Sequence, residues 1–122
     1  MIAEIDLCIP VLQSKDATES FEFYSSVLGF KKDWEHRYEK DFPLFISMSH
    51  GNLRVFITEH VNESAFGAEL YLFVKDIEQL ESHVKKSGIK FQVELHDTAY
   101  GTREFNIEDP DGNKLRIGQH TD

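Results

Sequence analysis

Cysteine and proline are scarce in this chain, which has one cysteine and three prolines among 122 residues. The single cysteine, Cys8, excludes an intramolecular disulfide and favours a reducing compartment. Because Cys8 lies in the apolar run Leu7–Ile9, we expect a buried and inert thiol. No apolar stretch approaches membrane-spanning length. The first ten residues contain two acidic and no basic residues, unlike a secretory signal peptide. We therefore expect a cytoplasmic protein.

Positive charge is also scarce. The chain has 13 Lys and Arg residues against 22 Asp and Glu residues, which gives a formal net charge of −9 and a pI near 5.1. Nucleic acids and anionic membranes bind positively charged surfaces, so the composition argues against both as partners. The acidic balance is compatible with a cationic ligand, and equally with an acidic surface that only provides solubility.

Aromatic residues are plentiful, with ten Phe, four Tyr and one Trp, and hydrophobic residues make up 40% of the chain. This length and composition predict one folded domain with a substantial core. The number of aromatic residues leaves some of them free to face a ligand rather than the core.

An internal repeat with a period of about 60 residues is the most informative feature of the sequence. Each copy has an Asp that opens a helix-like stretch, a Gly that closes it, and a later Gly-Asn turn. The matching positions are Asp16 and Asp76, Gly29 and Gly88, and the turns at 51–52 and 112–113. Two copies are too few for a repeat array. The sequence therefore predicts a pseudo-symmetric pair of halves that share one site.

Each half is predicted to have the order strand, helix, strand, strand, strand. Asp16 and Glu19 form a capping box that begins the first helix, and Asp76 begins the second. Expected strands cover residues 3–12, 30–39, 44–49 and 52–58 in the first half and 69–75, 89–95, 103–108 and 114–118 in the second. These elements predict an α+β fold in a single domain, 1–122, with module one at 1–62 and module two at 63–122.

Two motifs carry a resemblance to a known family. The first is Asp16 followed by FYSSVLGF at 23–30, and the second is YGTREF at 100–105 followed by DPDGN at 109–113. With these motifs the chain resembles the vicinal oxygen chelate superfamily, which includes glyoxalase I, the extradiol dioxygenases and the bleomycin-resistance proteins. It is most similar to the bleomycin-resistance branch. The resemblance implies two tandem βαβββ modules in a half-open cup, and a homodimer in which one chain completes the cup of the other.

The resemblance also implies where enzymes of the family hold a divalent metal through His, Gln and Glu side chains. In this chain the corresponding positions are Ile9, Glu69, Arg116 and one of Arg54 and Phe56. Only Glu69 can bind a divalent cation, which needs several neutral or anionic donors. The six histidines have no metal-binding spacing and are expected on the surface. We therefore predict no metal, no other cofactor and no catalytic residue.

Without a metal, the cup is predicted to be an aromatic groove for a small molecule. Glu69 and Arg116 either form an ion pair across the cup or bind a charged group of the ligand. Tyr100 either lies beside the groove or packs as an ordinary loop residue. Trp34 either stacks a planar cation or packs at a dimer interface. Phe56 is expected to form a third wall.

Three functions stay open at this point. The leading hypothesis is a metal-independent protein of the bleomycin-resistance type that sequesters a planar ligand. Positive charge on this ligand would be compatible with an acidic groove. The second is a metal-dependent lyase, isomerase or dioxygenase. The third is an interaction domain without a ligand, which would be favoured if Trp34 and Tyr100 were fully buried in a core or a dimer contact.

Overall fold

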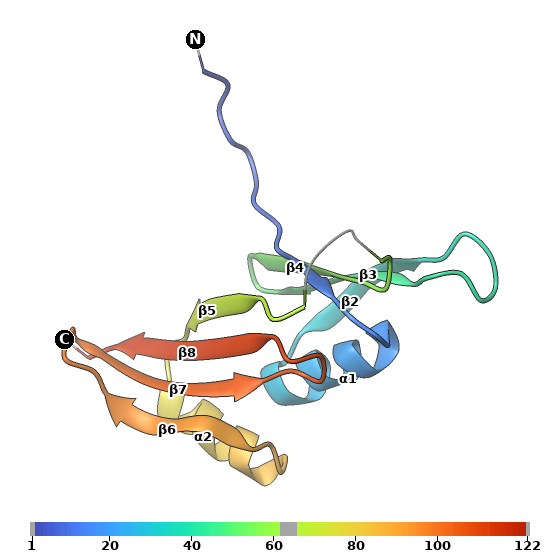
Figure 1. Cartoon of the computed structure of the whole chain (residues 1–122). Helices are drawn as coiled ribbons and strands as arrows, with labels where there is room; N and C mark the ends of the chain where they lie inside the picture. Colours follow the sequence, from blue (N-terminus) through green and yellow to red (C-terminus); the bar gives the residue numbers. More distant parts are fainter. Residues whose placement is uncertain (1, 62–65, 122) are drawn as a thin grey trace.

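The computed structural model describes residues 2–61 and 66–121, which form two helices and eight strands (Figure 1). In chain order these are β1 (Val11–Gln13), α1 (Ala17–Leu28), β2 (Lys31–His36), β3 (Phe45–His50), β4 (Leu53–Thr58), β5 (Glu69–Phe73), α2 (Ile77–Lys86), β6 (Phe91–Asp97), β7 (Thr102–Glu108) and β8 (Lys114–His120). No helix in the described part of the chain is long and apolar enough to cross a membrane.

The strands form two separate four-stranded sheets with the same topology. Sheet A has the order β1-β4-β3-β2 and sheet B the order β5-β8-β7-β6. In each sheet the first strand pairs in parallel with the last strand of its module, and the other pairs are antiparallel. The prediction of an α+β fold from two βαβββ modules is therefore confirmed. The predicted boundary at 62/63 lies outside the described residues.

The two helices begin where the repeat places an aspartate. The Asp16 carboxylate accepts a hydrogen bond from the Glu19 backbone N–H at 3.1 Å, and Asp76 accepts one from Gln79 at the same distance. These caps satisfy backbone donors that have no partner within the helix. Gly29 ends α1 in a left-handed conformation with φ of 75°, which glycine adopts without a steric cost.

One face of each sheet packs against a helix, and alternate strand residues supply that face. In sheet B these residues include Phe105, Ile107, Leu115 and Ile117, and in sheet A they include Leu12, Ile46, Met48, Val55 and Ile57, all fully or almost fully buried. Because strand side chains alternate between faces, the residues between them project from the opposite, helix-free face of each sheet.

A buried hydrogen-bond network joins the two modules. The Tyr24 hydroxyl on α1 donates to Asp109 Oδ2 in the β7–β8 turn at 2.7 Å. Burial, reinforced by the Asp109 carboxylate, raises the pKa of Tyr24 far above its ordinary value, so the hydroxyl remains a donor. Asp109 also accepts from the backbone N–H groups of Asp111 and Asn113. The DPDGN turn therefore anchors module two against the helix of module one.

The predicted first strand is largely wrong. Only Val11–Gln13 pair with β4, and residues 2–10 leave the sheet as an extended arm that points away from the body of the molecule (Figure 1). Pro10 has no N–H to donate to a neighbouring strand, and β4 begins at Leu53, so little strand lies alongside the arm. Cys8 lies on this arm and is exposed, which corrects the prediction of a buried thiol.

Candidate functional site

The helix-free face of sheet B carries an unusual set of side chains. Residues directly opposite one another in a ladder project from the same face, and the strand registers place two rows on this face. One row is Tyr71, Arg116, Asn106 and Val93, and the next is Phe73, Gly118, Glu104 and His96. We refer to Tyr71, Phe73, Tyr100, Glu104 and Arg116 as the sheet-B cluster.

Glu104 lies at the centre of this cluster with 3% of its surface exposed. Its carboxylate accepts hydrogen bonds from Arg116 Nε at 2.7 Å, from Thr102 Oγ1 at 2.8 Å and from the Tyr71 hydroxyl. Burial alone raises the pKa of Glu104, but the hydrogen bonds from Arg116, Tyr71 and Thr102 outweigh it and hold the pKa below its ordinary value. Glu104 is therefore a fixed anion that positions the groups around it.

Arg116 is the cation that Glu104 holds in place. Its guanidinium carbon lies 4.1 Å from the centre of the Tyr71 ring, in cation–π contact, and 5.8 Å from the Tyr100 ring. The Arg116 Nη2 group also donates to the Tyr100 hydroxyl. The hydrogen bond to Glu104 raises the pKa of Arg116 further. An immobilised guanidinium between two aromatic rings is suited to hold a flat, polar group of a ligand.

Gly118 leaves space for two aromatic rings on the same face. A Cβ atom at this position would lie 3.0 Å from Tyr71 Cε1 and 3.1 Å from Phe73 Cε1. The Tyr71 and Phe73 rings contact each other at 4.6 Å between centroids, and Phe73 contacts His120 at the same distance. The absence of a side chain at 118 therefore lets both rings lie across β8.

Sheet A carries a second aromatic group on its helix-free face. The Trp34 ring stacks on Phe45 at 5.8 Å with an interplanar angle of 12°, and Phe56 contacts both rings at 5.7 and 5.0 Å. The β2–β3–β4 registers place Trp34, Ser47 and Phe56 in one row. We refer to Trp34, Phe45 and Phe56 as the sheet-A cluster.

Neither of the two aromatic residues that discriminate between the hypotheses is a core residue. Trp34 is 46% exposed and Tyr100 is 64% exposed. Within the single chain, both have surface available to a ligand or to another protein. The hypothesis of an interaction domain without a ligand would be favoured if both rings were fully buried in the core of the chain, and neither ring is.

The positions that hold a metal in family enzymes do not suit a metal here. In module one, Val11 lies five residues before the capping Asp16 and opposite Phe56. In module two, Tyr71 lies five residues before the capping Asp76 and opposite Arg116. Phe56 is therefore the counterpart of Arg116 in module one. Ile9 lies on the arm and offers no donor atom. A phenyl ring and a guanidinium cannot coordinate a divalent cation. The residues present therefore do not fit a metal of the family type, and the described residues contain no other cluster of His, Cys, Asp and Glu that could hold one.

The predicted ion pair between Glu69 and Arg116 is wrong. Glu69 lies opposite Lys114 in the β5–β8 register and pairs with it at 3.3 Å, while Arg116 lies opposite Tyr71 and pairs with Glu104. Both members of the Glu69–Lys114 pair are about half exposed, so this pair contributes little to stability. Glu104 takes the place that sequence reasoning gave to Glu69.

The structure thus joins the predicted site residues in two groups. Tyr100 and Arg116 contact each other in the sheet-B cluster, and Trp34 and Phe56 contact each other in the sheet-A cluster. Sequence reasoning missed Tyr71 and Glu104. Tyr71 alternates with Leu70 and Leu72 along β5, and Glu104 lies in the Arg-Glu-Phe motif, so both signals were present in the sequence.

Comparison with known proteins agrees with this architecture. A family model described as glyoxalase superfamily protein matches residues 2–122. No curated protein matches the chain. Among solved structures, TnmS3, an antibiotic binding protein from Streptomyces sp. CB03234, is similar with a TM-score of 0.79 at 15% identity, over 98% of this chain and 99% of that chain.

Two further structures share the fold. Lactoylglutathione lyase from Agrobacterium tumefaciens has a TM-score of 0.77 at 13% identity, over 96% of this chain and 95% of that chain. A superfamily member from Sphaerobacter thermophilus DSM 20745 has a TM-score of 0.76 at 18% identity, over 98% of each chain. With the family match over residues 2–122, and with the same fold in these structures, the chain belongs to the glyoxalase superfamily.

Proposed function

We propose that this protein binds a planar small molecule without a metal, in the manner of the bleomycin-resistance branch, and sequesters it without chemical change. One observation carries the proposal. The two structurally equivalent positions on the helix-free faces hold Phe56 and Arg116, each within an aromatic cluster, in place of residues that could coordinate a metal.

The two clusters offer complementary contacts to such a ligand. The sheet-A cluster provides an exposed indole ring for stacking. The sheet-B cluster provides Tyr71 and Tyr100 beside a fixed guanidinium that can hydrogen-bond to a carbonyl or carboxylate of the ligand. With a net charge of −9, the protein also favours a ligand that carries positive charge elsewhere. Bleomycin, with a planar bithiazole and a cationic tail, has this combination of groups and serves as the first probe.

The fold neighbours leave the finer function open. One is an antibiotic binding protein and another is a lyase, and identities this low indicate a common fold rather than a common ligand. The site chemistry favours binding over metal-dependent catalysis because the Arg116 guanidinium would repel a divalent cation at the family position. The cytoplasmic location expected from the sequence stays a prediction.

Binding can be followed directly because Trp34 is the only tryptophan in the chain. We expect bleomycin to change Trp34 fluorescence in a saturable manner in protein treated with EDTA. At a hundred times its dissociation constant the ligand should add about 2.7 kcal/mol to stability, which corresponds to a rise of several degrees in melting temperature.

Substitutions locate the contact. Phe56→Ala and Tyr100→Ala should each weaken binding by roughly 1–3 kcal/mol, the range measured for stacking on aromatic side chains. Tyr38→Ala is the matched control, since Tyr38 is an exposed tyrosine outside both clusters. If both cluster variants bind as tightly as the control, the aromatic faces are not the binding site.

A further inference from the structure

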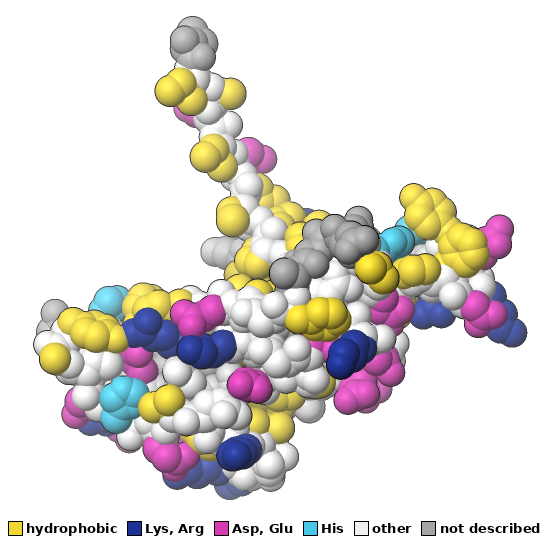
Figure 2. Space-filling model, in the orientation of Figure 1, with side chains coloured by type: hydrophobic (Ala, Val, Ile, Leu, Met, Phe, Trp, Pro, Cys, Tyr) yellow, Lys and Arg dark blue, Asp and Glu magenta, His cyan; other side chains and the backbone are white. Residues whose placement is uncertain are grey.

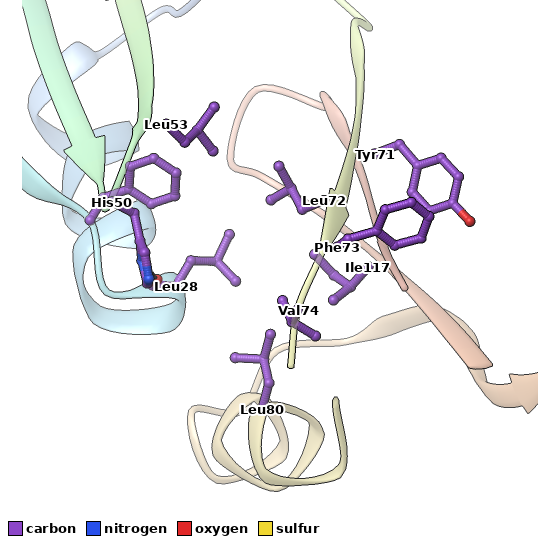
Figure 3. A pocket seen from close by; sticks show the side chains of 10 residues that line it. Leu28, His50, Leu53, Tyr71, Leu72, Phe73, Val74, Leu80 and Ile117 are labelled. Carbon is purple, nitrogen blue, oxygen red and sulfur yellow. Dashed lines mark hydrogen bonds between the residues drawn. The ribbon is translucent and has the colours of Figure 1, made fainter. Parts of the chain in front are cut away.

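Arg54 is an exposed cation on the helix-free face of sheet A, next to the sheet-A cluster. Its neighbour Leu53 lines an apolar cleft between the two modules (Figure 3). Because successive strand side chains project from opposite faces, Arg54 projects from the same face as Phe56, two positions later in β4. Lys31 lies opposite Ser49 in β3, and Ser49 lies opposite Arg54, so Lys31 and Arg54 share a row. Two cations therefore border the sheet-A cluster.

The internal repeat provides a comparison for Arg54. Its counterpart in module two is Lys114, since each of these residues lies two positions before the residue at the family metal position. Lys114 lies between two acidic residues in sheet B. One is Glu69 on β5, with which it pairs at 3.3 Å, and the other is Glu108, directly opposite it on β7. The cation of module two therefore has carboxylates on both sides.

Module one has the cation without these two acids. Glu69 lies seven residues before the capping aspartate of its module, and the residue at that position in module one is Ile9. Glu108 lies directly opposite its cation across the ladder, and the residue directly opposite Arg54 is Ser49. Neither Ile9 nor Ser49 carries a charge. The positive charge at this position is therefore available to an anion from outside the chain.

The two cations border a hollow of about 400 Å³ at one end of sheet A, which we call the Arg54 hollow. Its lining includes Lys31, Asp33, Ser49 and Arg54. Asp33 accepts a hydrogen bond from the Ser49 hydroxyl at 2.9 Å. Within residues 2–61 and 66–121, neither Arg54 nor Lys31 forms an ion pair or a side-chain hydrogen bond. Two cations against one carboxylate leave the hollow positive, and its volume is typical of a small-molecule site.

We propose that Arg54 and Lys31 bind a carboxylate of the planar ligand whose ring lies on the sheet-A cluster, which makes that ligand an aromatic acid. The inference rests on the proposed function and narrows its ligand class. Side chains two positions apart on one face of a strand are separated by about 7 Å. A fused two-ring acid can therefore place its ring on Phe56 and its carboxylate at Arg54. A guanidinium holds a carboxylate through two parallel hydrogen bonds, and Lys31 adds a second positive charge.

The acidic composition of the chain does not oppose an anion at this position. Exposed charges act over a distance of roughly 8 Å at physiological ionic strength, so the net charge of −9 does not determine the potential inside one hollow. Figure 2 shows basic and acidic side chains interspersed over the face that it displays. A ligand with a carboxylate at the Arg54 hollow and a positive charge elsewhere satisfies both the local and the overall charge.

Two probes, 2-naphthoate and 2-naphthamide, separate the charge of the ligand from its ring. They have nearly the same size and shape, and only 2-naphthoate is negatively charged at pH 7. In calorimetric titrations of the full-length protein treated with EDTA, we expect 2-naphthoate to bind about tenfold more tightly, because it forms charge-assisted hydrogen bonds. Added NaCl should reduce this preference, since salt screens exposed charges.

Substitutions assign the preference to the Arg54 hollow. The double variant Lys31→Gln, Arg54→Gln should bind the two probes with equal affinity, and its affinity for 2-naphthamide should match that of the wild type. Undiminished binding of 2-naphthamide also shows that the variant is folded. Lys114→Gln is the matched control, because it removes the cation at the same repeat position in module two, where Glu69 already pairs with it. This control should keep the preference.

Three results would overturn the inference: no binding of 2-naphthoate, equal affinity of the wild type for both probes, or a preference that survives in the double variant. If the probes bind equally and Phe56→Ala weakens both, the aromatic face is the binding site and only the carboxylate contact is refuted. If bleomycin does not bind but 2-naphthoate binds through Arg54, a ligand of the bleomycin type is refuted and the inference stands.

Discussion

Replacing Glu104 by Gln is the most informative single change, because Glu104 organises the sheet-B cluster. The substitution keeps the side-chain volume and removes the charge. Gln can still accept one hydrogen bond and donate to a hydroxyl. Its amide cannot pair with the Arg116 guanidinium in the way that a carboxylate does. The variant therefore isolates the charge of Glu104 from its packing.

The expected loss follows from the contacts. Glu104 accepts three hydrogen bonds, from Arg116, Tyr71 and Thr102, and hydrogen bonds to charged groups contribute roughly 1.5–3 kcal/mol each. The Arg116 side chain is 28% exposed, so water screens part of the ion pair, and Gln preserves part of the network. We expect a net destabilisation of about 2 kcal/mol at pH 7, or a melting temperature lower by roughly 6–10 °C.

The pH dependence provides a second readout. The hydrogen bonds hold the folded-state pKa of Glu104 below its ordinary value, which is about 4.3 in an unfolded chain. The stability that its charge contributes is therefore complete above the unfolded pKa and is lost as the pH falls through the folded pKa. Urea unfolding followed by circular dichroism should show the full difference between wild type and Glu104→Gln at pH 7 and a much smaller one at pH 3.

Glu108 provides the control, since it lies on the same strand and is exposed. Glu108→Gln should change the free energy of unfolding by less than about 0.5 kcal/mol. A Glu104→Gln variant as stable as wild type at pH 7 would refute the reasoning. So would a difference that stays constant from pH 7 to pH 3, because packing rather than charge would then account for it.

Other changes test the surrounding structure. Tyr24→Phe removes the hydroxyl that donates to Asp109 at 2.7 Å and should lower the free energy of unfolding by about 1–3 kcal/mol; an unchanged urea midpoint would mean that this bond does not hold the modules together. Gly118→Ala places a Cβ 3.0 Å from the Tyr71 ring and should weaken bleomycin binding while far-ultraviolet circular dichroism stays native; undiminished affinity would exclude this ring from the site. Glu59→Gln replaces a carboxylate that caps α1 by accepting a hydrogen bond from Ala17 N–H at 2.8 Å. This change should lower the free energy of unfolding by about 1 kcal/mol, measured by thermal unfolding. An unchanged free energy would show that the helix does not depend on this cap.

Local signals predicted much of the fold. The capping aspartates, Asp16 and Asp76, begin both helices as expected, because a cap depends on residues only three positions apart. Gly29 ends α1 as predicted, whereas α2 ends with its cap at Ser87, one residue before Gly88. The repeat itself predicted two modules of like topology, since equal spacing of caps and turns implies equal order of elements.

Features that depend on distant residues could not be predicted in this way. The burial of Glu104 and its partnership with Arg116 follow from the β7–β8 register and from the space over Gly118, neither of which a local pattern specifies. The arm was mistaken for a strand because apolar alternation predicts a strand but not the neighbour with which it pairs. The same gap explains the wrong partner predicted for Glu69, whose neighbour Lys114 is 45 residues away in sequence.

The central claim is that the aromatic clusters bind a planar ligand without a metal, and one calorimetric titration tests it most directly. Protein depleted of metal with EDTA is titrated with metal-free bleomycin, before and after addition of excess Zn²⁺. The account predicts a saturable heat with the same dissociation constant in both titrations, because Phe56 and Arg116 occupy the family metal positions. Heat that is absent from the EDTA-treated protein and appears only with Zn²⁺ would contradict it.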